Sequence, residues 1–288
     1  MPHANRPLVI FSHGNSFPGG TYTKLHRMLA SLGHTVKVLD RYGHDPRYPV
    51  TSNWPHLVQQ LADFVVHAAQ GHNGPLYLVG HSLGGFVSLM CAARFPSLGG
   101  RAINGVVMLD SPVLGGWKAR ALAVAKHTQM VGHLSPGAVS RKRRNQWPDA
   151  AAALAHFQGK RTFALWDADV LADYIAQGTE DVAMPDGSVH RALRFDREVE
   201  TAIYNTLPHN LDRMLRQHPL QCPVAFVGGT ESAEMKQVGM AMTRKVVRPD
   251  LHPERLRMVP GTHLFPMEYP TDTAQVVADI LRGIRPAA

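Results

Sequence analysis

One serine of this chain lies in a segment whose residue types suit nucleophilic chemistry. Residues 80–84 read GHSLG and directly follow the apolar run LYLV at 76–79. A G-x-S-x-G turn between a strand and a helix presents the serine hydroxyl at the carboxyl end of a sheet, and only small residues fit at its two glycine positions. The segment predicts Ser82 as a nucleophile, with the Leu83 amide directed at the negative charge that develops beside it. An ordinary strand–helix turn is the alternative for the motif taken alone.

Two distant segments supply the other groups that acyl transfer needs. His13 and Gly14 open a loop after the first apolar run, and its backbone could approach a ligand closely enough to donate a second hydrogen bond to an oxyanion. His263 lies in PGTHLFPMEYP, after the last apolar run, where an imidazole can take the proton from Ser82. The chain has 17 histidines, so a structural role is the usual alternative for any one of them. Their order along the chain favours a single site.

Alternating apolar runs and helical periodicity indicate the elements that would position these groups. Two helices are predicted at 21–33 and 54–71, each ending on a glycine, and a third at 271–284. Strands that alternate with helices are typical of a parallel sheet. We predict an α/β fold with a mostly parallel sheet of about six strands flanked by helices, with the strands at 8–11, 35–40, 76–79, 105–110, 224–228 and 256–260.

The strand rhythm stops between residues 113 and 216. Helix start and stop signals replace it, including Asp196 as a helix N-cap, and a Pro-Asp-Gly turn at 185–187 predicts a hairpin. Strand-like segments then resume. We therefore expect residues 1–112 and 217–288 to form the core, and residues 113–216 to form a mostly helical cap inserted into it.

The elbow, the His-Gly loop and the late histidine together resemble the α/β-hydrolase superfamily over nearly the whole chain. The resemblance implies that Ser82 is the nucleophile and His263 the base, and that the amides of Asn15 and Leu83 form the oxyanion hole. It also implies that the insertion is a cap or lid. The chain departs from the family in lacking the antiparallel hairpin that usually opens the sheet, since its first apolar run begins at Leu8.

The acid that would orient His263 has two candidates. Many relatives carry it in a G-x-x-D pattern after the strand that follows the cap, but in this chain Gly229 places Ser232 at that position and Glu231 one residue before it. Other branches carry it after the strand before the cap, where this chain has Asp110. A carboxylate is needed to hold the imidazole tautomer, and we favour Asp110 over Glu231. Helix or turn capping is the alternative role for either.

The predicted reaction is hydrolysis of a carboxylic ester through an acyl-enzyme intermediate, without a metal or cofactor. A serine nucleophile disfavours the dehalogenase and epoxide-opening branches of the superfamily, which use a carboxylate. Thioesterase, lactonase, amidase and carbon–carbon bond hydrolase activities are alternatives, as is a ligand-binding protein without catalysis. The predicted partner is a small-molecule ester. The substrate-binding candidates are His13, Ser16, His81, Trp117 and Trp166, although aromatic residues at helical spacing more often hold a cap onto a core.

Charge and composition limit the other classes of function. The 288 residues carry a formal net charge of +8, which favours anionic partners, but no basic stripe with interleaved aromatics, zinc-finger spacing or helix-turn-helix signal predicts nucleic-acid binding. Four basic residues at 141–144 precede Trp147 and either steer an anionic group or form a solvated helix face. A protein that docks this surface on anionic membranes is a further alternative. The sequence does not indicate an oligomeric state.

Hydropathy, the first residues of the chain and its two cysteines together predict the cellular location. No apolar run approaches the roughly 20 residues needed to span a bilayer, and the first residues do not read as a secretory signal. Cys91 and Cys222 lie in apolar contexts without metal or redox spacing, so we expect free thiols. These features favour the cytoplasm and no stable membrane insertion.

Overall fold

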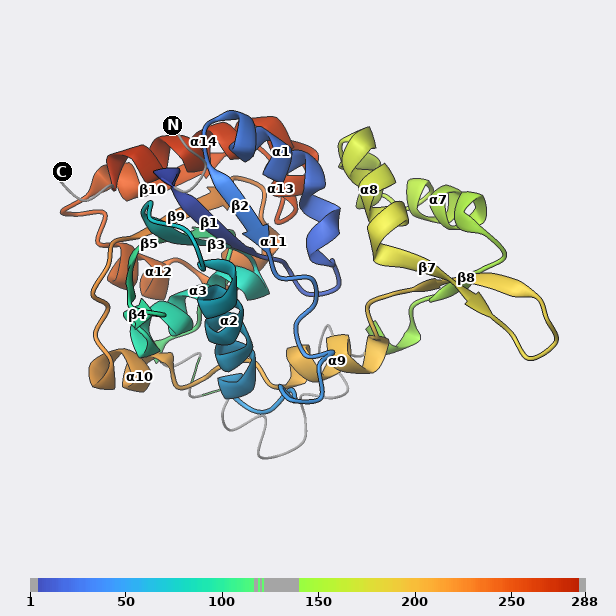
Figure 1. Cartoon of the computed structure of the whole chain (residues 1–288), viewed down its shortest axis with the longest axis horizontal. Helices are drawn as coiled ribbons and strands as arrows, with labels where there is room; N and C mark the ends of the chain where they lie inside the picture. The colour runs from blue at the N-terminus through green and yellow to red at the C-terminus, as the bar shows by residue number, and fades with distance from the viewer. Residues whose placement is uncertain (1–4, 117–118, 120, 122–139, 285–288) are drawn as a thin grey trace.

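The computed structural model describes residues 5–116, 119, 121 and 140–284. A parallel sheet crosses the centre of this part of the chain, in the strand order β10-β9-β5-β3-β1-β2 (Figure 1). One short antiparallel strand, β4 (Ser97–Leu98), pairs with β5. The prediction of a mostly parallel sheet of about six strands is confirmed, and its main strands are β1 (Leu8–Ser12), β2 (Thr35–Val38), β3 (Leu76–His81), β5 (Arg101–Leu109), β9 (Val224–Gly229) and β10 (Leu256–Val259).

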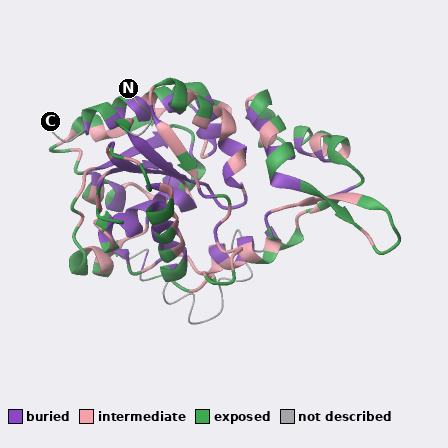
Figure 2. Cartoon of the chain, viewed as in Figure 1, coloured by how far each residue is buried: buried purple, intermediate pink, exposed green. Residues whose placement is uncertain are grey.

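The sheet is covered by helices on both faces, which explains its continuous apolar runs. Every residue of β1, β3 and β9 is buried (Figure 2). Alternate residues of β1 belong to two separate core clusters, with Ile10 on the face of α2 (Pro55–Ala68) and α3 (Leu83–Arg94). Phe11 faces α1 (Thr23–Ser31) and α14 (Pro270–Gly283). A strand buried on both sides has no polar face to show in its sequence.

Two of the predicted helix ends agree with backbone geometry. Gly33 follows α1 with a φ of +94°, and Gly71 follows α2 with a φ of +74°. Glycine adopts this left-handed region without the penalty that a Cβ imposes, so it ends a helix readily. The remaining helices beside the sheet are α11 (Ala233–Val238), α12 (Ala241–Val247) and α13 (Phe265–Glu268).

The segment between β5 and β9 contains both helices and a small antiparallel sheet. The predicted hairpin is present as β7 (Thr179–Ala183) and β8 (Val189–Leu193), and β6 (Gln146–Trp147) pairs with β8. The predicted cap at Asp196 is also present, since its side chain accepts from the amides at the start of α9. Whether residues 113–216 act as a separate cap domain stays a prediction. Its described helices are α7 (Ala150–Gln158), α8 (Ala168–Gly178), α9 (Arg197–Asn205) and α10 (Leu211–Gln217).

The inserted segment is attached to the core beside α1. Helix α8 packs against α1 and the 3-10 turn Gly19–Tyr22, and the Lys24 ammonium lies 2.8 Å from the carboxylates of both Asp167 and Asp169. The β7–β8 hairpin extends away from the sheet (Figure 1). Within the described part of the chain, no helix combines the length and apolarity needed to cross a membrane.

Candidate active site

Ser82 lies in the tight turn between β3 and α3. Its backbone has a φ of 53° and a ψ of −114°, a conformation that L-residues rarely adopt. A Cβ on Gly80 would lie 2.3 Å from the backbone of Gly84, and a Cβ on Gly84 would lie 2.1 Å from the Ser12 carbonyl oxygen. Both glycines are therefore required by backbone contacts, as the sequence predicts. Backbone strain at a half-buried serine that borders a pocket is typical of a functional turn.

Three side chains from distant segments form a hydrogen-bonded chain at the carboxyl ends of the strands. His263 Nε2 lies 3.0 Å from Ser82 Oγ, and His263 Nδ1 lies 2.7 Å from Asp110 Oδ2. An ionised carboxylate only accepts, so Nδ1 carries the hydrogen and Nε2 is left to accept from the serine hydroxyl. The Asp110 side chain is fully buried, and that of His263 is 14% exposed.

Asp110 is held by more than His263. Its Oδ1 accepts the Gly229 amide at 2.8 Å, and its Oδ2 also accepts the Ser232 hydroxyl at 2.5 Å. Ser232 in turn accepts from the Met235 amide and caps α11. These donors compensate for burial of a carboxylate, which is costly when its oxygens lack partners.

The alternative acid lies elsewhere. Glu231 is exposed, and its backbone amide donates to the Gly261 carbonyl. The structure thus brings Asp110, not Glu231, to the imidazole of His263. Ser232, which stands at the position where many relatives have the acid, contributes a hydroxyl to Asp110 instead.

The two segments predicted to supply oxyanion donors border the same cavity as Ser82. Leu83 is the first residue of the 12-residue helix α3, so its amide lies at the positive end of the helix dipole. Asn15 follows the His-Gly pair, and its side-chain amide donates to the Glu200 carbonyl at 3.1 Å. Both residues, with Ser82 and His263, line one pocket.

This pocket has a volume of about 430 Å³ and mostly apolar walls. The walls come from the start of α2, the start of α3, the loop after β5, α9 and α11. Glu234 and Gln237 of α11 add polar groups to the lining. An apolar cavity that ends on a nucleophile and a base suits an apolar group joined to a reactive carbonyl. The apolar wall residues are Trp54, Leu83, Phe86, Pro112, Leu114, Ile203, Leu207 and Val238.

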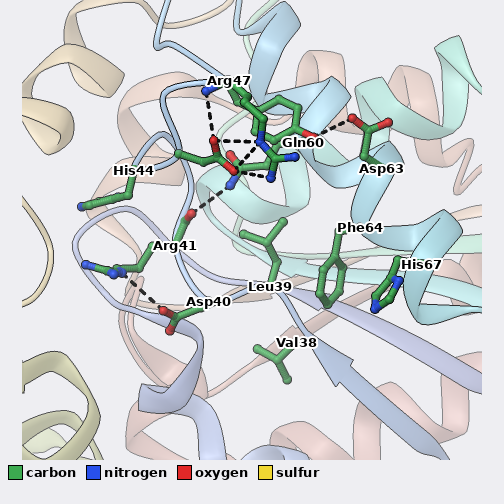
Figure 3. A pocket seen from close by; sticks show the side chains of 12 residues that line it. Val38, Leu39, Asp40, Arg41, His44, Arg47, Gln60, Asp63, Phe64 and His67 are labelled. Atoms are coloured by element: carbon green, nitrogen blue, oxygen red, sulfur yellow. Dashed lines mark hydrogen bonds and ion pairs between the residues drawn. The ribbon is translucent and has the colours of Figure 1, made fainter.

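A larger cavity of about 700 Å³ lies beside the end of β2 and has a different character (Figure 3). Arg47 pairs with Asp45 and Arg41 with Asp40, and Asp63 accepts a hydrogen bond from the Tyr48 hydroxyl. Neither Ser82 nor His263 lines it. This cavity is therefore separate from the candidate active site.

The comparison with known families decides the class of the protein. The sequence profile of the alpha/beta hydrolase family matches residues 9–276, which is nearly the whole chain. The chain belongs to the alpha/beta hydrolase family. Solved structures agree with the fold of this hydrolase: an E-2-(acetamidomethylene)succinate hydrolase superimposes with a TM-score of 0.67 at 23% identity, covering 96% of this chain and 91% of that one. A thioesterase domain from the curacin biosynthetic pathway gives a TM-score of 0.68 at 18% identity, covering 94% and 91%.

Curated relatives match the hydrolase over shorter stretches. A monoglyceride lipase homolog of monkeypox virus is 29% identical over 47% of this chain and 52% of its own length. The monoglyceride lipase of Homo sapiens is 30% identical over 38% of this chain and 36% of its own. A probable thioesterase of Glarea lozoyensis is 32% identical over 42% of each. The matches thus span about half or less of the curated relatives' length.

Two of the predicted substrate contacts are buried histidines that do not reach the pocket of the hydrolase. His13 Nδ1 donates to the Gly14 carbonyl and Nε2 accepts the Tyr42 amide at 2.9 Å. Burial lowers the pKa of His13 to about 4, so the ring is neutral near neutral pH. His81 is likewise fully buried and bonded to Tyr22 and to the His263 backbone. Neither ring lines the pocket and both are held by partners in the scaffold, so a contact of either with substrate stays a prediction.

The other predicted contacts are also absent from the pocket lining. Ser16 has a φ of 78° and donates its hydroxyl to the Glu200 carboxylate. Trp166 packs among aromatic rings, with its centroid 4.6 Å from that of Phe163 and 5.7 Å from that of Tyr174. The structural alternative for this tryptophan is to hold the inserted segment onto the core, and its ring centroid does lie 5.3 Å from that of Phe17. Trp117 lies outside the described residues.

A buried carboxylate that the sequence does not indicate, Glu200, lies behind the Asn15 loop. Glu200 is 3% exposed and accepts from the hydroxyls of Ser16 and Ser140, the latter at 2.9 Å, while Arg143 lies 2.8 Å from its Oε2. Arg143 belongs to the basic run 141–144, so part of that run pairs inside the protein. Arg144 also has a structural partner, the Gln146 carbonyl. No local sequence pattern predicts the buried role of Glu200, because its partners are distant in sequence.

The described residues also bear on metals and thiols. Among them, no group of three or more histidine, cysteine, aspartate and glutamate side chains could hold a metal ion. Cys91 and Cys222 are free, and burial raises the pKa of both thiols. Inert thiols fit this environment better than a reactive role.

Proposed function

We propose that this hydrolase cleaves carboxylic esters through an acyl-enzyme on Ser82. The observation that carries the proposal is the hydrogen-bonded chain from Ser82 Oγ through His263 to Asp110, at 3.0 and 2.7 Å. A nucleophile, a base in hydrogen-bond reach and a third group that orients the base are the parts that activate a serine. The serine of this chain also opens into the apolar pocket.

The proposed reaction has two half-steps. Ser82 Oγ attacks the ester carbonyl while His263 Nε2 takes its proton, and the imidazolium is stabilised by Asp110. The same proton passes to the leaving alkoxide as the acyl-enzyme forms. Water then attacks the acyl-enzyme, giving its proton to His263, and Ser82 leaves with that proton restored. The sum is ester plus water to acid plus alcohol.

The backbone amides of Asn15 and Leu83 are proposed to stabilise the tetrahedral intermediates. Both residues border the pocket beside Ser82, and the Leu83 amide has no acceptor available within its own helix because it occupies the first turn. Main-chain donors that are fixed before the reaction stabilise developing charge without reorganisation.

The substrate is proposed to be a small-molecule ester with an apolar acyl group. Most of the residues that line the pocket are apolar, and burial of apolar area in such a cavity favours binding. The monoglyceride lipase matches agree with an uncharged ester, and the probable thioesterase match makes thioesters the second candidate.

Residues 113–216 are proposed to act as a cap, since Ile203, Tyr204 and Leu207 of this segment line the pocket. Two free cysteines fit a reducing compartment such as the cytoplasm.

The test is a set of p-nitrophenyl esters of increasing acyl length, assayed on the wild-type protein and on Ser82→Ala. We expect turnover that Ser82→Ala abolishes, together with stoichiometric labelling of Ser82 by a fluorophosphonate probe. Acyl-thioesters of the same chain lengths distinguish the second candidate. A folded wild-type protein that neither turns over any of these substrates nor reacts with the probe would favour a ligand-binding protein without catalysis.

A further inference from the structure

A buried chain of hydrogen bonds runs beneath the candidate active site. The Gly14 amide donates to Tyr22 Oη at 3.0 Å, Tyr22 Oη lies 2.7 Å from His81 Nδ1, and His81 Nε2 lies 2.8 Å from the His263 carbonyl oxygen. His81 is fully buried and Tyr22 is 1% exposed. Neither side chain lines the pocket.

The hydrogens of this chain have only one consistent arrangement for a neutral imidazole. The His263 carbonyl accepts, so His81 Nε2 carries the hydrogen and Nδ1 presents its lone pair. Tyr22 therefore donates its hydroxyl hydrogen to Nδ1, and its oxygen accepts from the Gly14 amide. Every donor has an acceptor, which is what a buried polar network needs to fix a single geometry.

The protonation states agree with this arrangement. Burial, reinforced by the nearby His263, lowers the pKa of His81 well below its usual value, so the imidazole is neutral. Burial also raises the pKa of Tyr22, which keeps its hydroxyl hydrogen. The chain thus keeps one proton pattern across the neutral range.

The ends of the chain lie next to the groups that the proposed reaction uses. Gly14 precedes Asn15, His81 precedes Ser82, and the last acceptor is the backbone of His263 itself. We propose that Tyr22 and His81 are positioning residues that hold the oxyanion loop, the serine turn and the histidine loop in mutual register. This inference rests on the proposed function for its effect on catalysis.

Gly14 packs closely against both Tyr22 and His81. A Cβ at this position would lie 2.8 Å from His81 Nδ1 and 3.1 Å from Tyr22 Oη. The first distance is too short for a carbon, so a side chain at residue 14 displaces the network. The glycine of the His-Gly pair therefore serves the contact with Tyr22 and His81 in addition to any approach to substrate.

The first experiment reads the network without any need for activity. Long-range ¹H–¹⁵N spectra of histidine-labelled wild-type protein near neutral pH, assigned by loss of a signal in His81→Gln, report the tautomer of His81. We expect hydrogen on Nε2 only. A ring protonated at Nδ1, or at both nitrogens, overturns the proposal even if the protein is an active esterase.

The second experiment measures catalysis with a matched control. Tyr22→Phe leaves the Gly14 amide and His81 Nδ1 without their partner, and we expect kcat to fall by about 10- to 100-fold with a nearly unchanged KM. Tyr42→Phe removes a hydroxyl that is equally buried but bonds Ser12 Oγ at 2.8 Å, outside this network. It should cost comparable thermal stability and leave kcat within about twofold. Equal losses of kcat in the two variants overturn the positioning role.

A conservative rescue separates positioning from packing. Glutamine at residue 81 offers an acceptor for Tyr22 and a donor for the His263 carbonyl, whereas leucine offers neither. We expect His81→Gln to retain at least about tenfold more activity and a faster fluorophosphonate reaction than His81→Leu. If folded His81→Leu equals His81→Gln, the network has no positioning role. If the wild-type protein is inactive but shows the expected tautomer, the proposed function fails while the network stands.

Discussion

Replacement of Asp110 by asparagine tests the orientation of His263 directly. Asp110 Oδ1 must accept the Gly229 amide, so an asparagine at residue 110 keeps its carbonyl oxygen on that side. Its NH₂ group then faces His263 Nδ1, where the carboxylate Oδ2 lay at 2.7 Å. A donor at this place is compatible only with a lone pair on Nδ1. The hydrogen moves to Nε2, which can no longer accept from Ser82.

The expected loss follows from that change of tautomer. A serine whose base is held in the wrong tautomer loses on the order of 10⁴ in kcat, while binding of substrate is retained. We therefore expect Asp110→Asn to lower kcat by about that factor with a KM close to the wild-type value. Glu231→Gln is the control, because Glu231 is an exposed carboxylate in the neighbouring loop. It should change kcat by less than about threefold.

The assay is steady-state hydrolysis of a p-nitrophenyl ester, with thermal unfolding to show that each variant is folded. Fluorophosphonate labelling of Ser82 gives a second rate that does not depend on deacylation. A folded Asp110→Asn enzyme that keeps more than a tenth of the wild-type kcat would refute the orientation argument. A large loss of kcat in Glu231→Gln would identify Glu231, and not Asp110, as the acid that orients His263.

Two other predictions concern groups around the site. Ser232→Ala removes the hydroxyl that reaches Asp110 at 2.5 Å and also the cap of α11, so kcat for ester hydrolysis should fall by about tenfold. Ser232→Thr keeps a hydroxyl and should stay near the wild-type kcat, and equal losses of kcat in the two variants would contradict this prediction. Stability should decline as pH falls from about 6.5 toward 4, because His13, whose pKa is lowered to about 4, is neutral in the fold while the unfolded chain takes up a proton. For His13 alone this amounts to ~2 kcal/mol at a pH of about 5, and urea midpoints that do not change between neutral pH and that value would be inconsistent with it.

The sequence predicted the elements whose signals are local. Six strands and the glycine-flanked turn at Ser82 follow from apolar runs and from residues within five positions of each other. Asp110 and His263 were placed at the ends of predicted strands, and strand ends of a parallel sheet meet at one edge, so their proximity to Ser82 could be expected. Their roles in catalysis stay predictions.

The supporting groups could not be predicted in the same way. Tyr22 meets His81, Glu200 meets Ser16, and Ser232 meets Asp110, and each pair is far apart in sequence. A hydroxyl or carboxylate on an otherwise ordinary helix or loop carries no local sign of such a partner. Burial and the partners of His13 and His81 are likewise invisible in the sequence, where both residues are only candidates for substrate contact.

Ser16 offers a test of how backbone strain is held beside the proposed oxyanion loop. Its φ of 78° is unfavourable for any residue with a Cβ, and its hydroxyl donates to buried Glu200. Both Ser16→Ala and Ser16→Gly lose that hydrogen bond, but only glycine relieves the strain.

In an ordinary loop alanine is the more stable of such a pair, because glycine gains more entropy on unfolding. At Ser16 the order should reverse, with Ser16→Gly more stable than Ser16→Ala by about 1 kcal/mol in urea unfolding. Because glycine keeps the backbone geometry of residue 16, Ser16→Gly should also be the more active enzyme. An alanine variant that is the more stable would mean that residue 16 does not hold a left-handed conformation, and the argument from backbone strain would fail.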